Sequence, residues 1–114
     1  MTKKDLRQKW GWPLVDRTAL TEEEERQFVA DYTSFAESNQ QREVFLTDAK
    51  SLTAKDGKTR LKKYVGKPFE ILGTCSENET DSYWKTDLEC LPMWKIRFQD
   101  GQEAKAYAEE IFRI

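Results

Sequence analysis

The sequence predicts an α+β fold, in which an N-terminal helix packs against a small antiparallel β-sheet. Three observations carry this prediction. Apolar residues recur at helical spacing after Thr21. From Trp94 to Phe98, large apolar residues alternate with basic ones, as a half-buried strand requires. Asp100-Gly101 follows directly and is typical of a tight hairpin turn, since both residues tolerate positive φ.

Length and composition indicate one compact domain. The chain has 114 residues, with 19 Lys and Arg against 21 Asp and Glu, and its net charge is −2. This balance excludes a globally basic polyanion binder and is too mild for a strong DNA mimic. No run approaches the ~18 apolar residues that span a bilayer, and residues 1–5 lack an apolar signal core. We therefore expect no membrane partner and a cytoplasmic location.

The clearest helix is predicted from Glu22 to Glu37. Thr21 and Glu24 form a capping-box pair that satisfies free backbone N–H groups at the helix start. Its apolar stripe consists of Phe28, Val29, Tyr32, Phe35 and Ala36. A shorter helix is expected over residues 2–9, ended by Gly11 and Pro13.

The second half of the chain is predicted to be β-rich. Strands are expected over residues 69–74, 89–98 and 103–108, with a kink at Pro92 because proline lacks the N–H that a ladder needs. For the last of these, alternation favours a strand, whereas its Ala, Glu and Lys content favours a helix. A single terminal turn is expected over residues 109–112, a short strand over 44–46, and a turn at Asp56-Gly57. The chain thus divides into a helical part (1–50), a basic connecting segment (51–67) and a β unit (68–114).

The order of these β elements suggests a family. Gly66 to Gly73, a polar loop, Trp94 to Phe98 and then Asp100-Gly101 resembles a small SH3-like barrel of the Tudor-like kind. The resemblance covers roughly the last 50 residues and rests on pattern rather than on a specific motif. It implies a barrel with a binding surface of aromatic residues on loops at one end, and it leaves the ligand open.

The residue types predict no enzyme, no cofactor and no metal site. The chain has no histidine, which is the commonest general base and metal ligand. Two cysteines, Cys75 and Cys90, cannot build an all-cysteine zinc site and lack an imidazole partner for nucleophilic attack. Asp87 and Glu89 are the best carboxylate pair for a metal, but an exposed strand edge explains them better. We expect both thiols to be reduced and partly buried, although a disulfide between them is geometrically conceivable.

Aromatic residues outside the core predict a non-enzymatic module that binds a protein or peptide. Tyr83 and Trp84 lie in a polar loop, where large rings have little internal reason to be, and such residues are typical binding anchors. Trp10, Trp12 and Tyr107 are further candidates. The alternative for the loop pair is packing back onto the sheet, and the alternative for Trp10 and Trp12 is anchoring the N-terminal arm. Trp94 is expected in the core.

A basic stretch over residues 55–67 supports a second hypothesis, sequence-independent nucleic-acid binding. Its candidate residues are Lys58, Arg60, Lys62, Lys63, Tyr64 and Lys67. Lysines contact phosphates without precise geometry, and the tyrosine could stack on a base. The alternative is a solvated loop that balances the acidic helix. A third hypothesis, a small inhibitor or accessory protein of a phage or mobile element, rests only on size and on the lack of catalytic groups. The sequence predicts no oligomeric state.

Overall fold

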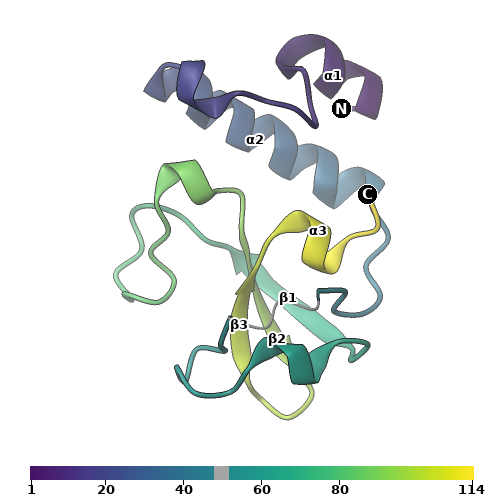
Figure 1. The fold of residues 1–114 in the computed structure, drawn as a ribbon, viewed down its shortest axis with the longest axis vertical. Coiled ribbons are helices and arrows are strands. Elements are labelled where there is room, and N and C mark those ends of the chain that lie inside the picture. Colours follow the sequence, from purple (N-terminus) through teal and green to yellow (C-terminus); the bar gives the residue numbers. More distant parts are fainter. Residues whose placement is uncertain (48–51) are drawn as a thin grey trace.

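The computed structural model describes residues 1–47 and 52–114 and confirms the α+β fold. Its helices and strands are α1 (Lys3–Trp10), α2 (Glu22–Asn39), β1 (Phe69–Thr74), β2 (Trp94–Phe98), β3 (Glu103–Ala106) and α3 (Ala108–Ile111). Three 3₁₀ turns connect them: η1 (Arg17–Ala19), η2 (Leu61–Tyr64) and η3 (Leu88–Cys90). Helices α1 and α2 lie at one end of the long axis, and the β2–β3 turn points to the other (Figure 1). The predicted boundary between residues 50 and 51 lies outside the described residues.

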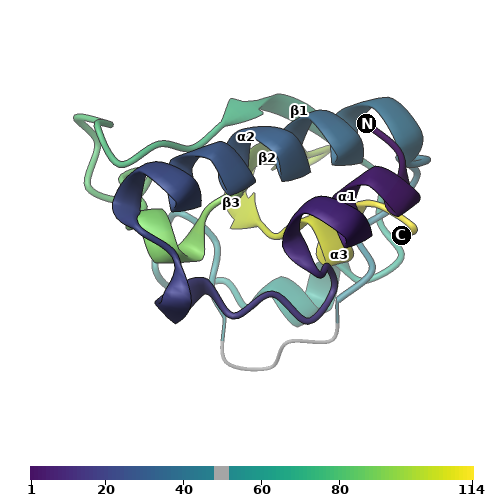
Figure 2. The same cartoon turned by 90° about the horizontal axis from the view of Figure 1, so that it is seen from above.

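Both predicted helices are confirmed, each with its local start signal. In α2, Thr21 Oγ1 accepts the Glu24 N–H at 3.1 Å, while a Glu24 carboxylate oxygen accepts the Thr21 N–H at 3.0 Å. This helix runs two residues beyond the predicted end at Glu37. Helix α1 lies beside α2 and ends at Gly11, whose φ of 76° is the left-handed conformation that glycine favours (Figure 2).

The sheet has three antiparallel strands in the order β1-β2-β3, so β2 is paired on both sides. Ile96 of β2 lies opposite Ile71 of β1 and Ala104 of β3. The predicted strand over residues 69–74 is confirmed, with a bulge between Ile71 and Gly73. The predicted strand over 103–108 is confirmed as far as Ala106, and the terminal turn is α3.

The strand predicted over residues 89–98 is too long by five residues. Residues 88–90 form η3, and the Leu91 N–H bonds back to the Leu88 carbonyl at 3.2 Å. Pro92 has no N–H to offer a ladder, and β2 begins only at Trp94. The proline therefore ends the turn instead of kinking a strand.

The strand predicted over residues 44–46 is wrong. Val44 makes an isolated bridge to Pro68. The Phe45 N–H bonds to the Lys67 carbonyl at 3.0 Å, and the Leu46 N–H bonds to the Glu110 carbonyl at 2.7 Å. Because successive N–H groups bond to different segments, no continuous ladder can form.

The three-stranded sheet is open, and the SH3-like barrel that the resemblance implied is not identified in the described residues. In the same residues, no helix combines the length and the apolar character needed to cross a membrane.

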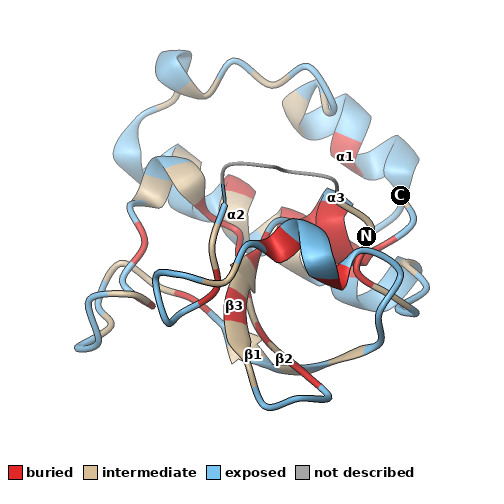
Figure 3. Cartoon of the chain, turned by 60° about the horizontal axis from the view of Figure 1, so that its bottom comes forward, coloured by how far each residue is buried: buried red, intermediate tan, exposed pale blue. Residues whose placement is uncertain are grey.

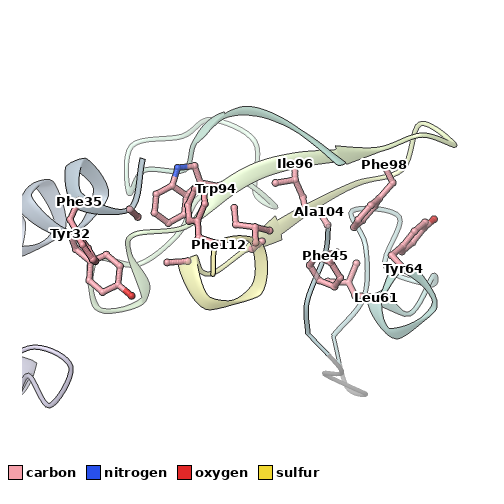
Figure 4. Close-up of a cluster of buried hydrophobic side chains, with 14 of the residues drawn as sticks. Tyr32, Phe35, Phe45, Leu61, Tyr64, Trp94, Ile96, Phe98, Ala104 and Phe112 are labelled. Atoms are coloured by element: carbon pink, nitrogen blue, oxygen red, sulfur yellow. The ribbon is translucent and has the colours of Figure 1, made fainter. Parts of the chain in front are cut away.

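One row of side chains on β2 organises the core (Figure 4). Trp94, Ile96 and Phe98 are almost completely buried, which confirms the prediction for Trp94. Trp94 packs edge-on against Phe112 with ring centroids 5.1 Å apart. At the other end of the row, Phe98 stacks on Tyr64 with centroids 4.0 Å apart. Figure 3 shows the contrast between this buried centre and α1, whose outer surface is exposed.

Glu110 on α3 is a buried acidic residue, with only 8% of its surface exposed. Burial raises the pKa of Glu110, and the charge of Glu109 adds to the shift, while hydrogen bonds from the Tyr107 N–H and from Thr47 oppose it. A raised folded pKa means that the folded state binds its proton more tightly than the unfolded chain, whose value is near 4.5. This group therefore lowers stability as pH rises through that range.

We predict that the stability of Glu110→Gln relative to the wild type increases from about pH 4 to about pH 7. The amide keeps the acceptor oxygen but carries no charge, so only the wild type loses stability when the carboxyl group ionises. Urea unfolding at both pH values measures the difference. The exposed Glu89→Gln is the control for the loss of one negative charge. A stability gain for Glu110→Gln that is no larger at about pH 7 than at about pH 4 would contradict a destabilising buried charge at this position.

Candidate functional site

The predicted exposure of the loop aromatics is wrong for Trp84, which is 8% exposed. Its ring packs with Cys75, Leu91 and Met93 in a second apolar cluster. The Nζ atom of Lys55 lies 4.9 Å from the ring centroid, at cation–π distance. The indole therefore holds the loop onto the sheet.

Tyr83 is half-buried and has an internal role too. Its ring packs edge-on against Trp84, with centroids 5.0 Å apart. Its hydroxyl accepts the backbone N–H of Lys105 at 2.9 Å. Since β3 is an edge strand, this bond covers a donor that would otherwise face solvent. The tyrosine thus closes the sheet edge.

Trp10 and Trp12 anchor the N-terminal arm, the alternative left open by the sequence. Trp10 Nε1 donates to an Asp31 carboxylate oxygen on α2 at 2.9 Å. Trp12 packs edge-on against Tyr32 and Phe35, with centroids 6.0 and 5.5 Å apart. Both indoles remain partly exposed, so Trp12 also forms part of a surface.

A groove runs between this arm and the segments around residues 89–92 and 107–109. Its volume is about 260 Å³, and Tyr107, 39% exposed, forms one side of it. The apolar walls are Trp12, Pro13, Val15, Phe28, Tyr32, Leu91 and Pro92. Leu14, between two of these wall residues, is 90% exposed. Of the five predicted partner-binding residues, the groove brings together Trp12 and Tyr107. We call it the Tyr107 groove.

Arg17 is the cation that lines the Tyr107 groove, and both terminal nitrogens of its guanidinium are engaged inside the protein. It donates to the carbonyl oxygens of Leu91 at 2.6 Å and Leu88 at 2.8 Å. It also lies 3.1 Å from a Glu25 carboxylate oxygen and over the Phe28 ring. Arg17 therefore fastens the arm to the η3 turn and offers little positive charge to a ligand.

The remaining charges of the Tyr107 groove are negative. Glu89 and Glu109 line it, and both are exposed. A Glu109 carboxylate oxygen accepts the Tyr32 hydroxyl at 2.6 Å, and burial together with this bond raises the pKa of Tyr32. Burial, followed by the nearby Cys90 thiol, raises the pKa of Tyr107. Both phenols stay neutral at physiological pH, so the groove combines neutral aromatic walls with an acidic rim.

A second hollow of about 420 Å³ adjoins Tyr107 and Cys90 on their other side. Its wall includes Leu52, Tyr83 and Lys105. Both cysteines are free, and one is buried and the other partly buried, as expected. Burial raises the pKa of Cys75, which keeps this thiol protonated and weakly nucleophilic.

The cations of the basic stretch are exposed, whereas its Leu61 and Tyr64 are buried. Lys58, Arg60, Lys62, Lys63 and Lys67 are exposed. Tyr64 is 4% exposed, stacks on Phe98, and donates its hydroxyl to Asp100 at 2.7 Å. The prediction that its ring is free to stack on a base is wrong, because that face already covers the core.

Comparison with family models, with curated proteins and with solved structures gave no match. Among the described residues, no group of three or more His, Cys, Asp and Glu is placed to hold a metal ion. The site therefore stands on its geometry alone.

Sequence reasoning missed Arg17, Glu89 and Glu109 as groove residues, and it missed the exposed Leu14 beside the groove. The run Trp-Gly-Trp-Pro-Leu-Val carried one usable signal. Its leucine follows a turn and belongs to neither a helical nor an alternating apolar pattern, so the sequence gives it no place in the core. The other three depend on contacts between segments more than 50 residues apart, such as the 74-residue separation of Arg17 and Leu91.

Trp84→Ala should destabilise the fold by about 3–5 kcal/mol, because it removes a large buried ring and leaves a cavity. Urea unfolding measures the loss. Trp84→Phe, which keeps an aromatic ring beside Lys55, should lose clearly less. A Trp84→Ala protein as stable as the wild type would contradict the internal role given to this indole.

Arg17→Met should cost about 2–3 kcal/mol, since it keeps the apolar stem but leaves two carbonyl oxygens without their charged donor. Arg7→Met on the exposed side of α1 is the control and should change little. Equal unfolding midpoints in urea for the two variants would show that the arm is held without Arg17.

Proposed function

We propose that this chain is a small non-enzymatic module that binds a protein through a short peptide segment laid in the Tyr107 groove. The observation that carries the proposal is an almost fully exposed leucine, Leu14, beside a groove with aromatic walls. Large aromatic residues in partly open pockets supply most of the energy at protein interfaces. An apolar side chain of the partner would gain contact with Trp12, Tyr107 and Leu14 together.

The charges of the groove specify the partner's chemistry. Glu89 and Glu109 are exposed on the rim, whereas Arg17 is engaged by two carbonyls and a carboxylate. A ligand with a Lys or Arg next to its apolar residue would complement this rim, and aromatic walls also attract cations. We therefore assign the groove an apolar–basic peptide. An inhibitor or accessory protein would use the same surface.

The other parts of the proposal depend less on the groove. A non-enzymatic role accords with a sequence that has no histidine. Binding at the Tyr107 groove does not require the sheet to close into an SH3-like barrel. A cytoplasmic location stays a prediction, with which two free thiols are compatible.

Leu14→Ser tests the proposal, because Leu14 contributes to the surface and hardly to the core. The probe is a pool of short synthetic peptides with Leu, Phe or Trp next to Lys, titrated into isotope-labelled protein and followed by amide NMR shifts. We expect shifts in residues 12–17, 89–92 and 107–109, and about tenfold weaker binding for Leu14→Ser, since burying a leucine contributes about 1.5–3 kcal/mol.

The control variant is Leu72→Ser, which alters a leucine of β1 that is 40% exposed and outside the groove. It should bind like the wild type. A second peptide pool with Glu in place of Lys should bind more weakly than the first. Shifts confined to other surfaces, or equal losses in both leucine variants, would overturn the groove as the binding site.

A further inference from the structure

We propose that the basic segment at the opposite end of the molecule binds single-stranded nucleic acid without sequence preference. The site consists of Lys58, Lys62, Lys63 and Lys67 together with a hollow beside η2. It is separate from the Tyr107 groove, since the two share no lining residue. Figure 1 places η2 toward the β2–β3 turn, away from α1 and α2.

The lysines of η2 point outward because the turn has its own inward face. A 3₁₀ turn repeats every three residues, so Leu61 and Tyr64 share one side, and both are buried. Lys62 and Lys63 lie between them in sequence and are exposed. The turn is fixed by the stacking of Tyr64 on Phe98 and by its hydroxyl bond to Asp100. The cations are thus presented from a rigid base.

Asp56 and Asp100 adjoin this segment and are hydrogen-bonded within the protein, and the charge of Lys63 also helps to lower the pKa of Asp100. Residues 57–69 contain no Asp or Glu at all. Asp56 accepts the Thr59 hydroxyl at 2.6 Å and the Lys58 N–H at 2.8 Å, and the bonds from Thr59, first its hydroxyl, lower the pKa of Asp56. The Gln102 backbone N–H and the Tyr64 hydroxyl lower the pKa of Asp100. In the described part of the chain, Lys58, Lys62, Lys63 and Lys67 form no ion pair.

A hollow of about 220 Å³ is lined by Lys63 and Lys67. Tyr64, Pro68 and Phe98 supply its apolar lining, and Gln99 and Asp100 complete it. The Asp100 carboxylate accepts the Tyr64 hydroxyl at 2.7 Å. A single strand carries one flat base next to each phosphate, which matches an apolar hollow flanked by cations. A duplex keeps its bases stacked inside, and an acidic peptide offers charge without a flat ring, so the single strand fits best.

The chemistry of the site predicts how binding depends on base sequence and on salt. Lysine contacts phosphate as a point charge, and the arginine-type fork that reads guanine is not part of the site. Binding should therefore be tolerant of sequence and steeply weakened by salt. The base in the hollow should add affinity beyond that of the phosphate backbone.

The test uses the full chain and a fluorescein-labelled oligothymidylate of about 20 nucleotides, followed by anisotropy at about 50 and about 200 mM salt. The triple variant Lys58→Gln, Lys62→Gln, Lys63→Gln should bind at least about tenfold more weakly at the lower salt, and its salt slope should flatten by about 2. The control triple Lys3→Gln, Lys4→Gln, Lys85→Gln has the same change in charge and should bind like the wild type.

Two ligand controls complete the test. An abasic strand of equal length should bind at least about fivefold more weakly, since base contacts are lost, and poly-glutamate should bind more weakly than the oligonucleotide. Unchanged affinity in the first triple variant, equal losses in both triples, or tighter binding of poly-glutamate would each overturn the proposal. Leu14→Ser should leave oligonucleotide binding unchanged, which separates this site from the Tyr107 groove.

Discussion

The buried row on the central strand is the constraint on which the rest of the structure depends. Because β2 is paired on both sides, Trp94 and Ile96 are each held by two ladders, and Phe98 is held by its pairing with Phe69 of β1. Trp94 meets Phe112 just after α3, and its Nε1 donates to Glu37 of α2 at 3.2 Å. Phe98 meets the η2 turn through the ring of Tyr64. One row of three side chains thus sets where the helices lie at one end and where the basic turn lies at the other.

The sheet edge explains why the loop aromatics are internal. Strand β3 pairs only with β2 and leaves its outer backbone groups to be covered. The Lys55 N–H donates to the Glu103 carbonyl at 2.8 Å, and the Lys105 N–H donates to the Tyr83 hydroxyl. Trp84 contacts both residues: its ring lies at cation–π distance from the Lys55 ammonium and packs edge-on against Tyr83. The loop is therefore part of the β unit, and the binding that we propose involves Tyr107 and Leu14 instead of the loop aromatics.

Sequence reasoning succeeded where a signal is local and failed where a contact is distant. The capping pair at Thr21, the alternation in β2 and the Asp100-Gly101 turn each act within a few residues, and each placed its element correctly. The burial of Trp84 depends on Lys55 and Met93, which the polar loop composition does not reveal. The Tyr107 groove needs the Arg17 side chain to reach carbonyls more than 70 residues away. A repeating pattern of apolar residues gives no information about such a contact between distant segments.

Tyr64 has a structural role beneath the proposed basic site. Its ring stacks on Phe98 and its hydroxyl donates to Asp100, so only the part of the ring that lines the hollow is left to meet a base. The same contacts hold η2 in place. A rigid turn loses less conformational freedom on binding than a flexible lysine-rich loop would. Freeing the tyrosine would therefore weaken the basic surface, since its cations would become mobile and Asp100 would become available to pair with them.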